Sequence, residues 1–218
     1  MSGVLVREHY GSREDWLANR KYIGGSEIAA MLGISPFMSN VDLWELKTGR
    51  KPPKDLSDNA AVEYGNRLEP ALRTLFATEH PELLVEHHPF DILYQTDFRY
   101  IRCTLDGDLT EKGTGRKGIL EIKTVQCTKR AIWDAWNGRV PQYYYTQCIG
   151  QLVSTGWDFV DLYAQLKKLN GDSVIKCYHF ERMEKLEDIE WLKTKAKQWW
   201  EGYVVNDIKP AFLLPDVL

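Results

Sequence analysis

The chain has 218 residues, of which 44% are hydrophobic and 27% are charged, and its formal net charge is −3 at pH 7. This length and composition are typical of a globular protein with one core, and no apolar run is long enough to predict a transmembrane helix. The slightly acidic balance argues against a surface that is basic throughout, but it allows a basic groove on an acidic body.

Four helices are predicted in the first 80 residues from their capping residues. Ser12 begins the first, and Asp15 follows three residues later in the manner of a capping box. Ser26 is expected to cap the second, which Gly33 ends. The other two are a helix over 41–49 and a longer amphipathic helix over 60–79, capped by Asp58 or Asn59.

Strand-like and helix-like segments alternate from residue 82 onward. Turn residues separate the first three strands and suggest an antiparallel meander. The predicted elements are strands over 82–94, 100–110 and 118–125, helices over 128–136 and 141–155, strands over 157–166 and 173–180, and an amphipathic helix over 183–203. This order predicts an α/β fold in which helices flank a central mixed sheet.

We expect a single domain over 1–218. Its parts would be a helical N-terminal part (1–80), a core (81–182) and a C-terminal helix with a tail (183–218). The four cysteines are too far apart for a CxxC motif, which predicts neither a zinc site, a redox pair nor an iron–sulfur cluster. The first residues lack the apolar segment of a secretory signal, so we expect a cytoplasmic protein without a membrane partner.

Two carboxylates and a lysine fall on adjacent predicted strands of the core. Glu121 and Lys123 are two residues apart, so their side chains share a face, and a Gly-rich turn would bring Asp106 beside them. Mg²⁺ prefers oxygen ligands, which the two acids and the Ile122 carbonyl supply. A lysine beside a metal can stabilise charge on a phosphate during hydrolysis. An exposed Glu–Lys pair has the same pattern, so both interpretations stay open at this point.

Three neighbouring features favour the catalytic interpretation. Pro70 inside a helix removes a backbone hydrogen bond and kinks the helix, which suggests that Glu69 is aimed into a site. Gly107 lets the backbone approach a ligand closely. Gln147 and Gln151 share one face of a tyrosine-rich helix, where an amide can orient the lysine or a water molecule. A solvated acid and water-facing amides would explain the first and the third feature equally well.

Five short motifs occur in the order and spacing of the PD-(D/E)xK nucleases. They are Arg20-x-x-x-Gly24-Gly25-Ser26, Gly65-x-x-x-Glu69-Pro70, Leu105-Asp106-Gly107, Glu121-x-Lys123 and Tyr144-x-x-Gln147. More narrowly, the stretch from about Arg20 to Gly156 resembles the phage lambda exonuclease / YqaJ-type viral recombinase family. The resemblance implies a restriction-endonuclease-like core. One departure is Ile149, where relatives often have the second glutamine of a Gln-x-Gln pair, and it leaves the role of Gln151 open.

The resemblance implies a Mg²⁺-dependent 5′→3′ exonuclease, with Mn²⁺ able to substitute. It would digest one strand of linear double-stranded DNA and leave a 3′ overhang for recombination by strand annealing. The implied catalytic residues are Glu69, Asp106, Glu121, Lys123 and Gln147. The implied metal ligands are Asp106, Glu121, the Ile122 carbonyl and Glu69, the last directly or through water. A pocket for the DNA 5′-phosphate is implied at Arg20, Ser26 and Thr104, and a helix N-terminus at Ser26 would independently favour a phosphate.

The resemblance also implies a ring-shaped homo-oligomer, with a trimer favoured, and a single-strand annealing protein as partner. The compartment would be the cytoplasm of a bacterium or of a phage-infected host cell. Two rival functions stay open. One is a restriction- or repair-type endonuclease on the same core, and the other is a catalytically inactive DNA-binding module, against which the intact Asp106, Glu121 and Lys123 set argues.

Two other features are given no functional role. His87 and His88 are neighbours on a predicted strand, and such neighbours point to opposite faces, so we do not expect them to bind a metal together. Trp199 and Trp200 lie among lysines near the C-terminus. We expect these tryptophans to pack in the core, with the lysines in solvent.

Overall fold

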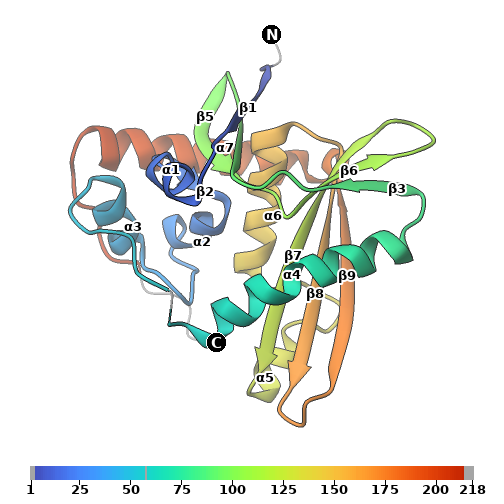
Figure 1. Ribbon diagram of the computed structural model, residues 1–218. Helices are drawn as coiled ribbons and strands as arrows, with labels where there is room; N and C mark the ends of the chain where they lie inside the picture. The colour runs from blue at the N-terminus through green and yellow to red at the C-terminus, as the bar shows by residue number, and fades with distance from the viewer. Residues whose placement is uncertain (1–2, 57, 214–218) are drawn as a thin grey trace.

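The computed structural model describes residues 3–56 and 58–213, which it arranges as two sheets with helices between and around them (Figure 1). Across the five-stranded sheet the order is β3 (Leu83–Glu86), β6 (Gly107–Glu111), β7 (Lys117–Cys127), β8 (Phe159–Lys168) and β9 (Ser173–Glu181). Across the four-stranded sheet it is β1 (Leu5–His9), β4 (Asp91–Gln95), β5 (Phe98–Cys103) and β2 (Ile23–Gly24). The predicted α/β class with a central mixed sheet is confirmed by the five-stranded sheet, whereas the second sheet was not predicted.

The helices lie mainly in the N-terminal part and around the two sheets. They are α1 (Arg13–Ala18), the 3₁₀ turn η1 (Gly25–Glu27), α2 (Ile28–Met31), α3 (Asn40–Lys47), α4 (Ala60–Glu79), α5 (Arg130–Asp134), α6 (Gln142–Thr155), the 3₁₀ turn η2 (Arg182–Lys185), α7 (Leu186–Trp199) and the π-helix η3 (Trp200–Val205). None of the helices in the described ranges is long and apolar enough to cross a membrane.

The expected antiparallel pairing of the three segments is confirmed, since β3 pairs with β6 and β6 with β7, but the first two segments are each divided between the two sheets. The segment 82–94 forms β3 in one sheet and β4 in the other, and Phe90 between them has φ 64°, a left-handed conformation that interrupts a strand. The segment 100–110 is divided in the same way into β5 and β6. Strand β1, which was not predicted, pairs with β4, so the N-terminal part is not purely helical.

Strands β7 and β8 are parallel neighbours, which requires a crossover connection. Helices α5 and α6 supply it, and α6 stands between the five-stranded sheet and the N-terminal helices (Figure 1). Gly156 ends α6 with φ 72°, as predicted. A side chain at Gly150 would come within 2.0 Å of Ile28, so this glycine lets α6 approach α2 closely.

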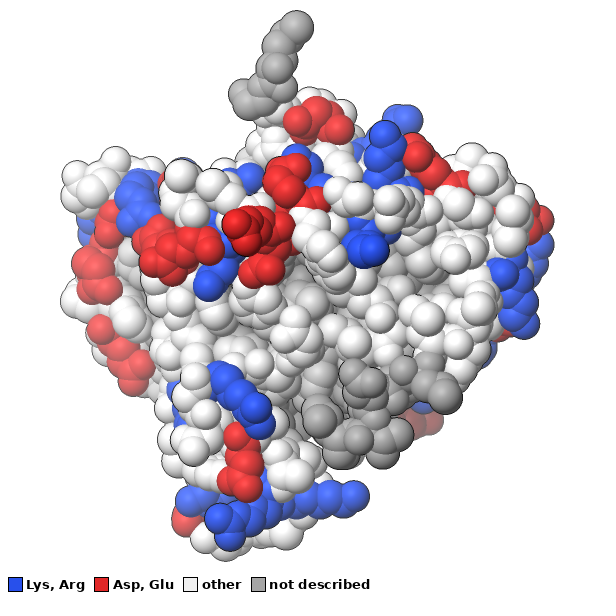
Figure 2. All heavy atoms as spheres, turned by 180° about the vertical axis from the view of Figure 1, so that it is seen from behind, with Lys and Arg blue, Asp and Glu red and all other residues white. Residues whose placement is uncertain are grey.

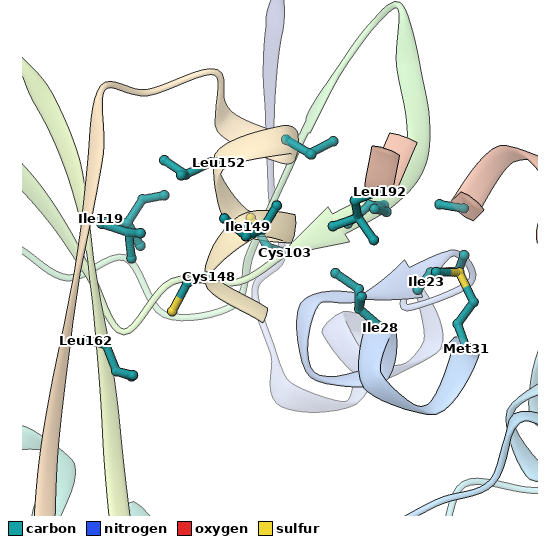
Figure 3. Close-up of a cluster of buried hydrophobic side chains, with 14 of the residues drawn as sticks. Ile23, Ile28, Met31, Cys103, Ile119, Cys148, Ile149, Leu152, Leu162 and Leu192 are labelled. Atoms are coloured by element: carbon teal, nitrogen blue, oxygen red, sulfur yellow. The ribbon is translucent and has the colours of Figure 1, made fainter. Parts of the chain in front are cut away.

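Alternation along β7 separates two apolar clusters. Leu120 and Ile122 pack with Leu72 and Phe76 of α4. Ile119, on the opposite face, belongs to the larger cluster around α6. Figure 3 shows the α6 side chains of this cluster between the sheet and the N-terminal helices; its members include Ile28, Cys103, Cys148, Ile149, Leu152 and Leu162. Odd-numbered positions of β7 therefore face α6, and this is the face that carries Glu121 and Lys123.

Two of the three helix caps named from the sequence are confirmed. The side chain of Ser12 accepts a hydrogen bond from the Asp15 N–H at 3.1 Å, and Asn59 caps α4 by accepting from the N–H groups of Ala61 and Val62. The predicted helix cap at Ser26 is wrong. Gly24 precedes the helical turn, and its own N–H donates to the carboxylate of Glu27 at 2.7 Å, which leaves Ser26 inside the turn.

The C-terminal helix is confirmed, although it changes to a π-helix after Trp199. Trp199 is 7% exposed, as expected of a core residue. Trp200 is half-buried and stacks on Tyr22 with 5.0 Å between ring centroids. Lys195 and Lys197 lie at the surface, as expected. So does Trp191 of the same helix, which is 51% exposed and has Nζ of Lys195 at 5.8 Å from its ring centroid.

Candidate active site

The side chains of Glu121 and Lys123 meet on the α6 face of β7. Nζ of Lys123 forms an ion pair with Oε1 of Glu121. The Glu121 residue is 2% exposed, and its carboxylate also accepts hydrogen bonds from the side-chain amides of Gln147, at 2.6 Å, and Gln151. Both oxygens of this buried acid are therefore occupied by groups of the protein itself.

Asp106 lies in the turn between β5 and β6, one residue before the register pair of Gly107 with Leu120. Its Oδ2 accepts a 2.7 Å hydrogen bond from the backbone N–H of Ile122. The carboxylate thus extends the β6–β7 ladder by one step and comes to lie beside Glu121. The structure brings the two acids together, as the Gly-rich turn predicted.

Glu69 reaches the site from α4. One of its carboxylate oxygens forms an ion pair with the guanidinium of Arg73, one helical turn further along. Nε of Arg73 also donates a 2.6 Å hydrogen bond to the backbone carbonyl of Asp106. A single arginine therefore holds Glu69 in place and ties α4 to the turn that carries Asp106. Pro70 lies inside α4, as the sequence indicated.

Burial and the grouping of acids raise the pKa values of Asp106 and Glu69. Burial, followed by the charge of Glu121, raises the pKa of Asp106 well above its ordinary value. Burial also raises the pKa of Glu69; Arg73 opposes this shift and Glu121 adds to it. Burial acts to lower the pKa of Lys123, but the carboxylates of Glu121 and Asp106 outweigh it and raise that pKa, so the lysine is an ammonium at neutral pH. The negative charge of the grouped carboxylates therefore exceeds the positive charge beside them.

The donor set agrees in type with a hard divalent cation. Its atoms are carboxylate oxygens and the Ile122 carbonyl, which Mg²⁺ and Mn²⁺ prefer, and a cation would relieve the repulsion that raises the pKa values of Asp106 and Glu69. Within residues 3–56 and 58–213, however, no group of three or more His, Cys, Asp or Glu side chains is arranged to hold a metal ion. Because both oxygens of Glu121 are occupied, a cation that binds this acid has to displace Lys123 from it.

One cavity of about 420 Å³ brings together most of the site residues expected from the sequence, although Ile122, the expected carbonyl ligand, is not among the residues that line it. Its wall includes the five expected catalytic residues and the three expected phosphate-binding residues. These are Glu69, Asp106, Glu121, Lys123 and Gln147, together with Arg20, Ser26 and Thr104. Residues from both sheets and from the N-terminal helices thus share one opening, which no single sequence motif shows.

Arg20 has a charge that no carboxylate neutralises within the described part of the chain. Its guanidinium lies over the ring of Trp16, 4.9 Å from the centroid. Ser26 is exposed inside the η1 turn beside it. Ser26 lies within the first helical turn and not at its cap, so its role in binding a phosphate stays a prediction. Its place in the cavity wall remains.

Thr104 lies in the cavity wall with its hydroxyl already engaged. The hydroxyl donates to the backbone carbonyl of Asp91 at 2.7 Å and accepts from Nε1 of Trp16 at 2.9 Å. A phosphate oxygen needs a donor, and the single hydroxyl hydrogen of Thr104 is used elsewhere. Its contact in this structure positions Trp16, which in turn lies under Arg20.

Arg102 is a second guanidinium in the cavity wall, and no sequence motif pointed to it. It lies between the rings of Tyr22 and Tyr94, at 4.2 and 3.9 Å from their centroids. Its NH1 donates to a carboxylate oxygen of Glu8 at 3.2 Å. Unlike Arg20, it is therefore paired with an acid.

Three more residues near the acids were missed or left open. Gln151 binds Glu121 directly, and its four-residue spacing from Gln147 was the signal. Arg73 follows Glu69 by the same spacing. His87 lines the cavity, and burial followed by the charge of Arg73 lowers its pKa, whereas His88 points to Asp108, 3.7 Å away. The two histidines do point apart, as expected.

The fold is that of alkaline exonucleases of the PD-(D/E)xK type. An alkaline exonuclease (LHK-Exo) from Laribacter hongkongensis superposes with a TM-score of 0.64 at 20% identity, covering 89% of this chain and 94% of that one. A crystal structure of LHK-Exo in complex with dAMP superposes equally well, with a TM-score of 0.64 at 19% identity over 90% and 94% of the two chains. The expected restriction-endonuclease-like core is confirmed.

Sequence comparison narrows this class. The YqaJ-like viral recombinase domain matches residues 15–158, more than half of the chain, and the chain belongs to that family. It is 27% identical over 210 residues to the uncharacterized protein YqaJ of Bacillus subtilis (strain 168). That alignment covers 95% of this chain and 61% of YqaJ, so the chain spans less than two thirds of its relative.

Proposed function

We propose that this protein is a metal-dependent 5′→3′ exonuclease that digests one strand of linear double-stranded DNA. The product would be a 3′ overhang for recombination by strand annealing. The observation that carries this proposal is the shared cavity, which combines Asp106, Glu121, Lys123 and Glu69 with the unneutralised guanidinium of Arg20. Membership of a viral recombinase family and the fold of an exonuclease crystallised with dAMP support DNA as the substrate.

Four groups would hold the metal: the carboxylates of Asp106 and Glu121, the carbonyl of Ile122, and Glu69 directly or through water. When bound, Mg²⁺, or Mn²⁺ in its place, polarises the scissile phosphate and lowers the pKa of a nearby water. Arg73 keeps Glu69 at the site, since it is anchored on the Asp106 carbonyl.

Lys123 and the two glutamines have separate tasks. As an ammonium, Lys123 turns its charge to the phosphate once Glu121 no longer pairs with it, and it stabilises the negative charge that develops there. Gln147 and Gln151 each donate an amide hydrogen to Glu121, so the acid keeps its orientation while its ion pair opens.

Arg20, with Ser26 beside it, would bind the terminal 5′-phosphate. A charge-assisted contact from a guanidinium to phosphate fixes the end of the strand, and this places one phosphodiester over the acids. We further propose, on the pattern of the family, a ring-shaped homo-oligomer, with a trimer favoured, and a single-strand annealing protein as partner. The setting would be the cytoplasm of a bacterium or phage-infected cell.

Linear and closed circular duplexes of one sequence, with each strand labelled separately, test the proposal. We expect Mg²⁺ or Mn²⁺ to support loss of one strand from its 5′ end on the linear duplex only. Ca²⁺ should allow binding without cutting, because its looser coordination polarises water less. Cutting of the closed circle would favour an endonuclease. Binding without cutting in Mg²⁺ would favour an inactive DNA-binding module, and cleavage in excess EDTA would exclude the metal.

A further inference from the structure

A second cavity, of about 410 Å³, lies where β7 and β8 end beside α5. Its wall includes Lys129, Arg130, Lys168 and the half-buried ring of Trp133. None of the described residues that line it is acidic. We call this the basic cavity. Figure 2 shows several Lys and Arg side chains, with Asp or Glu side chains among them, at the lower tip of the molecule, where Figure 1 places α5 and the β8–β9 turn.

The positive charges of the basic cavity are largely uncompensated. Nζ of Lys168 is 4.7 Å from the centroid of Trp133, and Nζ of Lys176 approaches the same ring at 5.7 Å. Within the described ranges, neither Lys129 nor Lys168 forms an ion pair, and Arg130 has only Asp134 at 3.4 Å. On a chain whose net charge is −3, unpaired cations gathered around one hollow indicate an anionic ligand.

We propose that the basic cavity binds the phosphate backbone of DNA. Two ammonium groups already lie against Trp133, so the ring orients the lysines and is not free to stack on a base. The recognised group is therefore phosphate, and the contact does not depend on sequence.

The position of the basic cavity along the DNA rests on the proposed function. Cys127, in its wall, lies four residues beyond Lys123 on the same face of β7, which corresponds to about 13 Å along the strand. Lys123 and the basic cavity therefore lie on one face of β7, and a DNA strand that follows this face would contact both.

Binding of a labelled 20-base-pair duplex in EDTA, measured by fluorescence anisotropy over a range of salt, tests the contact itself. The double variant Lys129→Gln/Lys168→Gln is compared with Lys185→Gln/Lys195→Gln. That control removes the same charge from lysines that also lie near aromatic rings, but outside both cavities. Losing two phosphate contacts should reduce the salt slope of log K by about 1.8 and raise Kd roughly 10- to 60-fold at 0.1 M salt. Equal slopes for the two pairs, or no binding by the wild type, would overturn the proposal.

Neutral phosphates locate the contact. In a series of duplexes, one methylphosphonate is moved along the linkages on either side of the cleaved bond. Some positions should weaken binding by the wild type and by the control pair while leaving binding by Lys129→Gln/Lys168→Gln nearly unchanged. Equal sensitivity of all three proteins at every linkage would overturn the proposed contact. Failure of the proposed function has a different signature, namely wild-type binding without strand digestion in Mg²⁺.

Discussion

The two halves of the active-site cavity differ in how their charges are paired. On the five-stranded sheet, Glu121 is bound by Lys123 and by two glutamines, and Asp106 is bound by a backbone N–H. On the N-terminal side, Arg20 lies on an aromatic ring without an acid. The first half must therefore exchange partners before it can bind a metal and act on a phosphate, whereas the second half is ready for an anion.

The largest effect is expected from substitutions on the five-stranded sheet, in the half of the cavity whose acids are already paired and which would catalyse hydrolysis. Glu121→Gln and Lys123→Ala should each reduce strand digestion by roughly 10²- to 10³-fold or more, because one removes a proposed metal ligand and the other a charge that acts on the phosphate. The control is Lys117→Ala on the same strand, whose ammonium contacts Thr110 at 2.7 Å outside the cavity. Initial rates on a 5′-phosphorylated linear duplex measure the effect. Full activity in either variant would refute the catalytic assignment.

The N-terminal half of the cavity, where Arg20 has no acidic partner, should make the digestion rate depend on the phosphate at the 5′ end of the DNA. A charge-assisted contact is worth about 1.5–3 kcal/mol, so wild type should digest a 5′-phosphate end roughly 10- to 100-fold faster than a 5′-hydroxyl end. Arg20→Ala should be slow on both ends. Arg13→Ala removes an exposed arginine of α1 outside the cavity and should keep the preference. Equal wild-type rates on the two ends would mean that Arg20 does not bind this phosphate.

Gln147 and Gln151 both bind Glu121, and substituting each in turn separates an effect on stability from an effect on activity. Gln151→Leu should lower the free energy of unfolding by about 1 kcal/mol, because a buried carboxylate loses a donor. The loss is at the low end since Oε1 of Gln151 has no partner among the described residues, and leucine removes that cost as well. A fall in Tm of about 2–4 °C is expected. Gln147→Leu, at a cavity-lining position, should cost less stability but slow digestion roughly tenfold. The reverse ranking would contradict these roles.

The smallest effect concerns an ion pair of the five-stranded sheet away from the cavity. Hydrogen bonds to Asp161, at 2.7 Å, and to Glu181 raise the pKa of His179 to about 9. Because the folded pKa lies above the unfolded value, this stabilisation is complete below pH ~6.5 and is lost as the pH rises through about 9. The side chain is half exposed, so the gain is at most about 1 kcal/mol. Unfolding of wild type and His179→Gln at pH 6 and pH 9.5 should differ only at the lower pH.

Local hydrogen bonding explains which parts of the fold were predictable. The caps at Ser12 and Asn59 depend on residues next to them in sequence, and both were recognised. The transfer of 82–94 from one sheet to the other was not, because strands of both sheets share the same two-residue alternation and nothing in that pattern marks a change of sheet.

The active-site residues likewise divide into those whose positions local sequence patterns predicted and those that depend on distant contacts. Strand periodicity was enough to place Glu121 and Lys123 on one face, and the turn placed Asp106 beside them. The hydroxyl of Thr104 is used by Trp16, 88 residues away in sequence, and such a contact leaves no local trace. Arg73 could be read as an ordinary surface arginine of α4 until its second bond, to the Asp106 carbonyl, is seen.

The division of neighbouring segments between two sheets also fixes when the protein can fold during its own synthesis. Strands β1 and β2, which flank Arg20, find their partners only in β4 and β5, so residues 5–24 must wait for residues 91–103 to leave the ribosome. Glu121 then waits for β8, its parallel neighbour, and for Gln151 on α6. Both halves of the cavity are therefore completed late in translation, and a nascent chain that ends before α6 carries no complete site.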